Sequence, residues 1–116
     1  MKAAVVRTPG GLNNIEVIDI ADPGRPGPGE IRVALHASSL NFHDLLVANG
    51  GIPTADGRVL MADGAGVVEA VGEGVSEFQV GDHVVSGFFP QWPDGEVGTS
   101  VSNFAGTPGD GIDGFA

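Results

Sequence analysis

The chain has 116 residues and a formal net charge of −10, from 15 acidic and 5 basic residues. This length fits one domain, and the acidic charge excludes a nucleic-acid-binding surface, which needs clustered Lys and Arg. The sequence contains no cysteine and no apolar run of membrane-spanning length. Disulfides are therefore excluded, and we expect a cytoplasmic protein with no membrane contact.

Five short segments have the composition of β-strands and are separated by turns rich in glycine and proline. In chain order they are Lys2–Val6, Ile15–Ile20, Glu30–Ala37, Gly66–Val71 and Asp82–Gly87. In the third segment apolar and polar residues alternate, which predicts a half-buried strand. With 20 glycines, 8 prolines and 41% hydrophobic residues, this pattern is typical of a turn-rich β-barrel or sandwich.

The segments between and after these strands differ in character. Asp22–Glu30 holds three prolines and three glycines, which predicts a surface connector. The one helix candidate is Phe42–Asn49, and Gly50 stands where a glycine ends a helix. Residues 88–116 show no sustained periodicity, so we expect a loop-rich tail. Because long structureless segments are uncommon in compact domains, this tail is either a functional loop or precedes closing strands that the chain lacks.

The segment "GAGVVEAVGEG" (Gly64–Gly74) has some features of the glycine-rich turn that binds dinucleotides. Gly64 and Gly66 match the first two glycines of that motif, but Glu69 stands where the third is needed. The β-branched run that follows is typical of a strand and not of a helix. We therefore expect a strand ending in a turn, whose glycines allow close approach to a neighbouring strand.

Three motifs resemble, in order and spacing, the start of the catalytic domain of medium-chain dehydrogenase/reductases. They are "SSLNFHDLLVANG" (Ser38–Gly50), "LMADGAGVVEAVGEGV" (Leu60–Val75) and "VGDHVVSG" (Val80–Gly87). The resemblance implies a mainly β fold over residues 1–116: a GroES-like, partly open antiparallel β-barrel of the alcohol dehydrogenase N-terminal type, with one short helix. It also implies that the domain is incomplete and that the cofactor-binding Rossmann domain is absent. NADP or NAD would then be bound mainly by that missing domain, and the chain alone is expected to be inactive.

The resemblance also bears on metal binding. In zinc-dependent members of the family, the positions corresponding to Asn41 and Ala62 hold a cysteine and a histidine that bind the catalytic zinc. Alanine has no donor atom, and a neutral amide is a poor ligand for Zn²⁺. We therefore expect no zinc and no other metal, which narrows the resemblance to the zinc-independent, quinone-oxidoreductase-like branch.

The same motif implies roles for the residues at the start of the expected helix. The amide of Asn41 is expected at the cleft floor, where it would donate to substrate or cofactor in place of a Lewis acid. His43 is expected to act as a general acid, and Phe42 to pack against the cofactor or substrate. The alternatives are structural: Phe42 and Leu45 as core contacts, and Asp44 as a local cap or ion-pair partner.

Three further residues complete the expected substrate pocket. Asp63 occupies the place of the family's glutamate after the zinc histidine, where it would contact substrate or support the structure. Phe89 and Trp92 belong to an aromatic cluster that is expected either in the core or in the pocket wall. His36 and His83 lack partners at metal-ligand spacing, so we expect them at the surface or in satisfied structural positions.

These observations lead to two functional hypotheses. In the first, the chain is the substrate-binding lobe of an NAD(P)H-dependent, zinc-independent oxidoreductase. The full enzyme would transfer a hydride to or from a small-molecule carbonyl, quinone or activated alkene, and a homodimer is compatible with it. In the second, the chain is a non-enzymatic GroES-like β-barrel that acts through protein contacts. The short length and the missing fingerprint favour the second hypothesis, and the polar motif at Ser38–Gly50 favours the first.

Overall fold

The computed structural model describes residues 1–92, 94–96 and 107–116. Within them the fold is mainly β with one short helix, as the sequence predicts. A 3₁₀ turn at Leu12–Asn14 joins the first two strands. The elements in chain order are β1 (Lys2–Val6), β2 (Ile15–Asp19), β3 (Ile31–Ala37), α1 (Phe42–Ala48), β4 (Arg58–Val59), β5 (Ala65–Val71) and β6 (His83–Val85).

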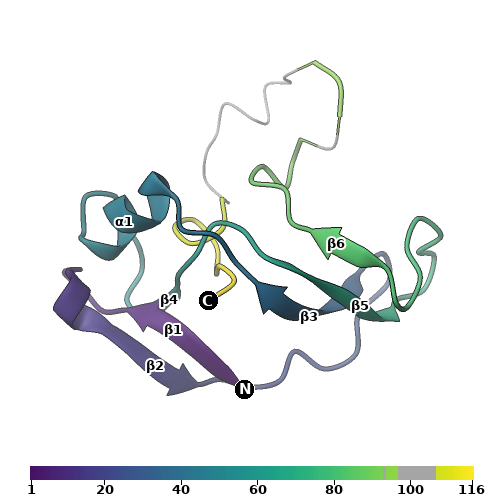
Figure 1. The fold of residues 1–116 in the computed structure, drawn as a ribbon, viewed down its shortest axis with the longest axis horizontal. Helices are drawn as coiled ribbons and strands as arrows, with labels where there is room; N and C mark the ends of the chain where they lie inside the picture. Colours follow the sequence, from purple (N-terminus) through teal and green to yellow (C-terminus); the bar gives the residue numbers. More distant parts are fainter. Residues whose placement is uncertain (93, 97–106) are drawn as a thin grey trace.

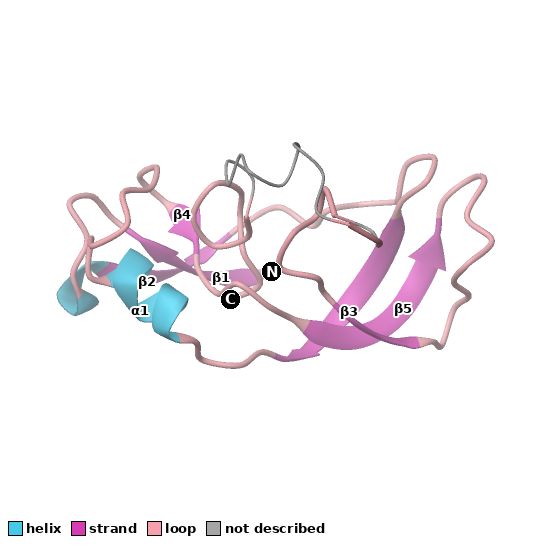
Figure 2. Cartoon of the chain, turned by 90° about the horizontal axis from the view of Figure 1, so that it is seen from above, coloured by secondary structure: helices cyan, strands magenta, loops and turns pink. Residues whose placement is uncertain are grey.

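The strands form two antiparallel sheets, ordered β2–β1–β4 and β3–β5–β6 (Figure 1). Strand β1 is central in the first sheet, where Val5 pairs with Glu16 on one side and Val59 on the other. Seen from above, the two sheets lie at opposite ends of the molecule, and α1 accompanies the first sheet (Figure 2). The segment from β3 to α1 therefore crosses from one sheet to the other.

The core of the domain lies around β1, β4 and α1. The buried residues form two groups: Val47 and Ala48 of α1 pack with Val6 and Leu60, and Ala3 and Val5 of β1 pack with Val59. Ala116 packs against both groups of buried residues. The last three residues also donate backbone hydrogen bonds to the carbonyls of residues 59–61, so the C-terminal segment is held against the end of β4.

The second sheet is less covered than the sequence predicts. The expected alternation on β3 is wrong: none of its residues is buried, and Leu35 is 48% exposed. The register between β3 and β5 shifts twice: Glu69 of β5 is the extra residue at the first shift, and His36 of β3 is the extra residue at the second. Such irregularities disturb the alternation of side chains between the two faces of a sheet. The buried residues of this sheet lie instead on β5, where Val68 is 1% exposed.

Most other sequence predictions of secondary structure are confirmed. The predicted strand Lys2–Val6 is β1, and "GAGVVEAVGEG" forms a strand and a turn, with no helix after it. Gly50 ends the helix with a φ of 84°. Strand β4 was missed because two residues are too few to show a period.

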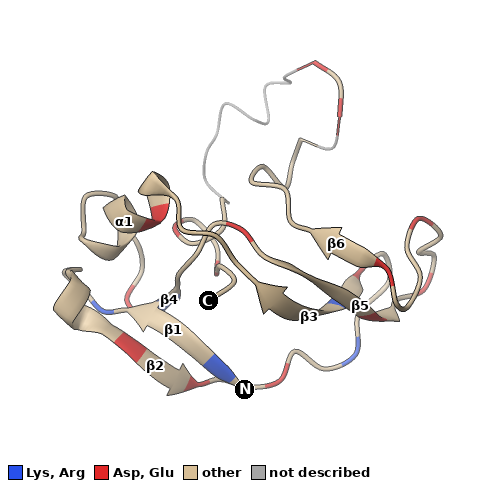
Figure 3. Ribbon diagram, in the orientation of Figure 1, with Lys and Arg blue, Asp and Glu red and all other residues tan. Residues whose placement is uncertain are grey.

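The segment after β6 contains no further long strand or helix among its described residues. The described residues after β6 form turns and an isolated bridge between Pro108 and Ile112. In the described part of the chain, no helix is long and apolar enough to span a bilayer. Acidic residues are spread over both sheets and their loops (Figure 3). Arg32 pairs with Asp22 at 2.7 Å and Glu69 at 3.0 Å, which ties the proline-rich connector to the second sheet.

Candidate functional site

The candidate site begins where the chain leaves β3 and enters α1. Asn41 is the N-cap of the helix and has an extended backbone, with φ −114° and ψ 157°. Its backbone N–H donates to the Asp44 carboxylate at 2.8 Å. Asp44 is the third helical residue, whose side chain is the acceptor in a capping box. This local arrangement fixes the start of the helix and sends the side chains of residues 41–43 in different directions.

The carboxylate of Asp63 gathers the polar groups that precede the helix. It accepts the backbone N–H and the hydroxyl of Ser39 at 2.8 and 2.7 Å, and the amide Nδ2 of Asn41 at 3.0 Å. The hydroxyl of Ser38 donates to the Asp63 backbone carbonyl at 2.7 Å. The hydrogen bonds from Ser39, and then that from Asn41, lower the pKa of Asp63 to about 2, so this carboxylate is ionised at neutral pH.

We expect the substitution Asp63→Asn to reduce the loss of stability in acid. The native pKa of Asp63 is about 2, and an unfolded aspartate has one of about 3.9. Between these values the unfolded state binds more protons, so the stabilisation is present above about pH 4 and is lost as the pH falls to about 2. Urea unfolding across this pH window should show that the free energy of unfolding falls more steeply with decreasing pH in the wild type than in the variant. Parallel declines would contradict the low pKa.

Asp44 connects Asn41 and Ala62, the two positions that were expected from the resemblance to correspond to zinc ligands. Its side chain is only 5% exposed. One carboxylate oxygen accepts the backbone N–H of Asn41, and the other accepts the backbone N–H of Ala62 at 2.8 Å. The expectation that Asp44 caps the helix is confirmed, but its bond to Ala62 was not predicted. Because of this bond, residues 41 and 62 are held close together.

Phe42 and Leu45 do not belong to the core. Phe42 is 74% exposed and Leu45 46% exposed, so their interpretation as core contacts is wrong. Both line a largely apolar groove of about 570 Å³ at the start of α1. Asn41 and Asp44 supply its polar side chains. The remaining lining residues are Leu12, Ile15, Leu40, Ala48, Leu60 and Met61.

A second, more polar pocket of about 330 Å³ adjoins the Asp63 carboxylate. Ser38, Ser39 and Ser86 bring three hydroxyl groups to its lining. Asn41 lines the apolar groove and also donates to Asp63, so it connects the groove to this pocket. The structure thus brings together three of the sequence-predicted site residues: Asn41, Phe42 and Asp63.

The other predicted site residues form a separate group. The His43 ring meets Phe88 edge-on, with centroids 5.2 Å apart. The row continues from Phe88 to Phe89 at 4.9 Å and from Phe89 to Trp92 at 6.0 Å. The predicted aromatic cluster therefore exists, and His43 stands at its end. Its Nε2 atom lies 3.3 Å from an oxygen of Asp110.

Asp110 was missed in the sequence because it lies in a turn-rich segment with no motif around it. Its carboxylate accepts hydrogen bonds from the Thr107 hydroxyl and the Gly111 backbone N–H. Burial acts to raise the pKa of Asp110, but these bonds and the neighbouring His43 outweigh it and lower the pKa below its usual value. Asp110 is therefore ionised at neutral pH beside the imidazole.

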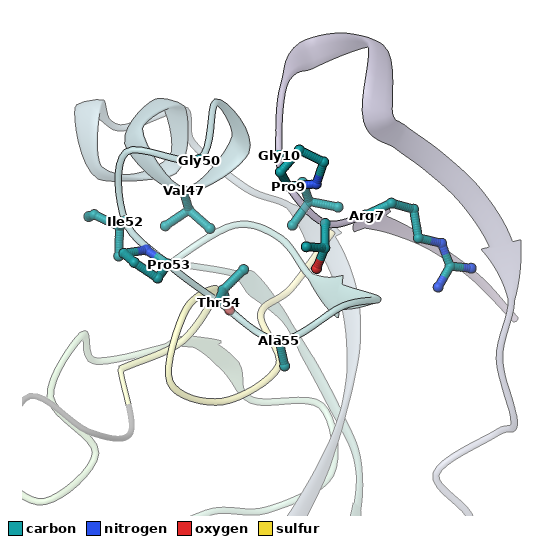
Figure 4. A pocket seen from close by; sticks show the side chains of 11 residues that line it. Arg7, Pro9, Gly10, Val47, Gly50, Ile52, Pro53, Thr54 and Ala55 are labelled. Atoms are coloured by element: carbon teal, nitrogen blue, oxygen red, sulfur yellow. The ribbon is translucent and has the colours of Figure 1, made fainter.

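Another pocket, of about 280 Å³, lies between residues 6–10 and the loop after α1 (Figure 4). Its lining includes Pro9, Ile52 and Pro53 and none of the predicted site residues. The Arg7 side chain at its edge extends away from the space between the two segments (Figure 4) and pairs with Glu16 at 2.9 Å. This pocket therefore offers no free charge to a ligand and is not the candidate site.

The comparison with protein families decides the classification of the chain. The model of the alcohol dehydrogenase GroES-like domain matches residues 27–116. The chain belongs to this family. It is the GroES-like domain of the medium-chain oxidoreductases, and these 116 residues cover only that region.

The relatives of this GroES-like domain are longer proteins. A mycocerosic acid synthase-like polyketide synthase of Mycobacterium tuberculosis is 56% identical over 81 residues, which are 68% of this chain and 4% of that protein. The Pseudomonas syringae quinone oxidoreductase is 41% identical with a TM-score of 0.65, over 77% of this chain and 27% of that one. An NAD-dependent alcohol dehydrogenase is 37% identical with a TM-score of 0.75, over 98% of this chain and 35% of that one. The chain thus spans a small part of each relative.

Proposed function

We propose that this GroES-like domain is the substrate-side lobe of a zinc-independent, NAD(P)H-dependent oxidoreductase. The whole enzyme transfers a hydride to or from a carbonyl, a quinone or an activated alkene. The observation that carries the proposal is that neither Asn41 nor Ala62 offers a side-chain ligand to zinc, while Asn41 lies beside an apolar groove and an ionised carboxylate. Two similar solved structures, a quinone oxidoreductase and an NAD-dependent alcohol dehydrogenase, support the reaction class.

The residues at this place do not fit a zinc ion. Ala62 has no side-chain donor, and its backbone N–H is bonded to Asp44. The Asn41 amide directs its nitrogen toward the Asp63 carboxylate, and an amide nitrogen acts as a donor with no lone pair available for a metal. Within the described residues, no three His, Asp or Glu side chains are grouped so that they could hold a metal ion. Carbonyl polarisation therefore falls to hydrogen-bond donors.

The apolar groove fits one edge of a nicotinamide cofactor. Phe42 and Leu40 are 74% and 87% exposed at its rim, where they would contact a flat ring. The bound nicotinamide supplies or accepts the hydride. Asn41 Nδ2 has two hydrogens and lies near three acceptors, on Ser39, Asp44 and Asp63. The side chain is thereby fixed at the groove edge, and it donates to a ligand when it releases one of these acceptors.

The decisive experiment joins this domain to the remainder of one of its longer relatives. Residues 1–116 replace the matching segment of the Pseudomonas syringae quinone oxidoreductase, and NAD(P)H oxidation is followed with a quinone, an enoyl thioester and an aldehyde. We expect turnover of one of these acceptors, whereas the 116-residue chain alone should give none. Asn41→Ala in the chimera should lower kcat/KM at least about tenfold, since it removes a hydrogen-bond donor at the edge of the groove.

Asn49→Ala is the matched control for this substitution. Asn49 caps the other end of α1 and accepts the backbone N–H of Gly51, far from the Asp63 carboxylate along the helix. We expect its kcat/KM to stay within about twofold of the parent. A folded chimera that oxidises NAD(P)H with none of the acceptors contradicts the proposed function. Stoichiometric zinc in an active chimera contradicts the zinc-free assignment.

The non-enzymatic β-barrel remains the second candidate because the second sheet exposes apolar side chains. Val85 on β6 is 79% exposed and Leu35 on β3 is 48% exposed, which suits a protein contact. Light scattering separates the two candidates. A defined ring-sized oligomer of the 116-residue chain favours the interaction module, and a monomer favours the lobe of a larger enzyme.

A further inference from the structure

His43 lies between the carboxylates of Asp44, its neighbour in the chain, and Asp110, which is far away in sequence. Its Nε2 atom is 3.3 Å from Asp110 Oδ2, and its Nδ1 atom is 3.8 Å from Asp44 Oδ1. The imidazole is 22% exposed, and Asp110 is 17% exposed. Nδ1 is buried and finds no hydrogen-bond partner among the described residues. Within the described part of the chain, the contact with Asp110 is therefore the polar contact of hydrogen-bonding length that the ring makes.

That contact determines which nitrogen carries the proton. An ionised carboxylate only accepts hydrogen bonds, so an unprotonated Nε2 at 3.3 Å from Asp110 would place two lone pairs against each other. The hydrogen bond made by one ring nitrogen sets the tautomer of the whole imidazole. We propose that Asp110 is a positioning residue that keeps the His43 proton on Nε2 and holds the ring against Phe88.

Asp110 is itself held in place by its own turn. Its Oδ1 atom accepts the hydroxyl of Thr107 and, at 2.6 Å, the backbone N–H of Gly111. Its backbone carbonyl accepts the hydroxyl of Thr54 at 2.6 Å. With Oδ1 occupied by two donors, Oδ2 is the oxygen presented to His43. The turn is thus a pre-formed acceptor for the imidazole.

The consequence for the site rests on the proposed function. His43 is the first ring of a row that continues through Phe88 and Phe89 to Trp92. An edge-on contact of this kind depends on the orientation of each ring. If the row forms the wall of the substrate pocket, Asp110 sets the position of that wall without touching the substrate.

The test is the tautomer of His43 in the variant Asp110→Asn. The amide oxygen must stay at the Oδ1 position, since an NH₂ group there would clash with the Gly111 N–H. The NH₂ group then faces His43 Nε2, which must become an acceptor. Long-range proton–nitrogen correlation spectra of the 116-residue chain, recorded about two pH units above the ordinary histidine pKa near 6.5, report this directly. We expect Nε2–H in the wild type, and in the variant a shift of at least about tenfold toward Nδ1–H.

The chain offers controls for this experiment. His36 and His83 are exposed on the second sheet, so their signals should not change. Asp113→Asn makes the same chemical change in the same segment, but the Asp113 carboxylate accepts from Arg58 and from the Val59 backbone N–H. In this variant His43 should keep its proton on Nε2. Asp110→Glu retains the carboxylate and should also keep it.

Two results would overturn the inference. One is a folded Asp110→Asn variant in which His43 keeps its proton on Nε2. The other is an Asp113→Asn variant that shifts His43 as strongly as Asp110→Asn does, because the effect would then come from loosening the turn. Neither result depends on turnover, so failure here is distinct from failure of the chimera to oxidise NAD(P)H.

Discussion

The substitution Asp44→Ala is expected to destabilise the chain by about 3 kcal/mol. The side chain is 5% exposed and accepts the backbone N–H groups of Asn41 and Ala62, each at 2.8 Å. Removing an acceptor from a buried donor costs about 1–3 kcal/mol for each group left unpaired. Ala62 is itself only 3% exposed, so little water can replace the lost bond. The good helix propensity of alanine offsets only a few tenths of a kcal/mol.

Urea unfolding at neutral pH measures this loss, and Asp19→Ala is its matched control. Asp19 pairs with Lys2 at 2.6 Å, but their side chains are 74% and 69% exposed. Exposed pairs of this kind contribute about 0–1 kcal/mol, so we expect a change within about 0.5 kcal/mol. The variant Asp44→Asn keeps one acceptor oxygen, so its loss of stability should lie between those of Asp44→Ala and Asp19→Ala. Similar losses for Asp44→Ala and Asp19→Ala would show that the bond to Ala62 contributes little.

Much of the secondary structure was predictable because short runs of neighbouring residues determine it. Runs such as Lys2–Val6, the helix end at Gly50 and the glycines around β5 each specify a strand or a turn with few neighbours involved. The alternation in Glu30–Ala37 was misleading because bulges and the cover of a sheet depend on its partner strands. Only the paired structure shows that the register between β3 and β5 shifts twice.

The candidate site was predictable where its residues are neighbours in the chain. Asn41 and Phe42 follow directly from the motif, and both line the groove. The bonds that define the site's chemistry connect segments far apart: Asp44 to Ala62, and His43 to Asp110. No local pattern marks Asp110, since a turn aspartate is common whatever it faces. Such pairs become visible only when the chain is folded.

The substitution Gly66→Ala is expected to cost about 3 kcal/mol or more. Gly66 is buried on β5 and pairs with Leu35 of β3. A Cβ atom there would lie 2.0 Å from the carbonyl oxygen of Ala34 and 2.8 Å from its carbonyl carbon. Because both are backbone atoms, no side-chain rotation relieves the clash and the two strands must move apart. Overpacking that a side chain can relieve already costs about 1–3 kcal/mol.

This loss should be localised as well as large. The pairing of β3 with β5 carries the start of the Ser38–Gly50 motif to Asp63, since Ala37 pairs with Ala65. Hydrogen exchange should therefore show lost protection on β3 and β5 together with a weakened bond from the Ser39 N–H to Asp63. Gly87→Ala is the control, because its added Cβ would meet nothing within 4 Å; we expect stability within about 0.5 kcal/mol of the wild type. Equal stability of Gly66→Ala and Gly87→Ala would mean that the strands do not approach this closely, and the register that delivers Ser39 to the site would have to be different.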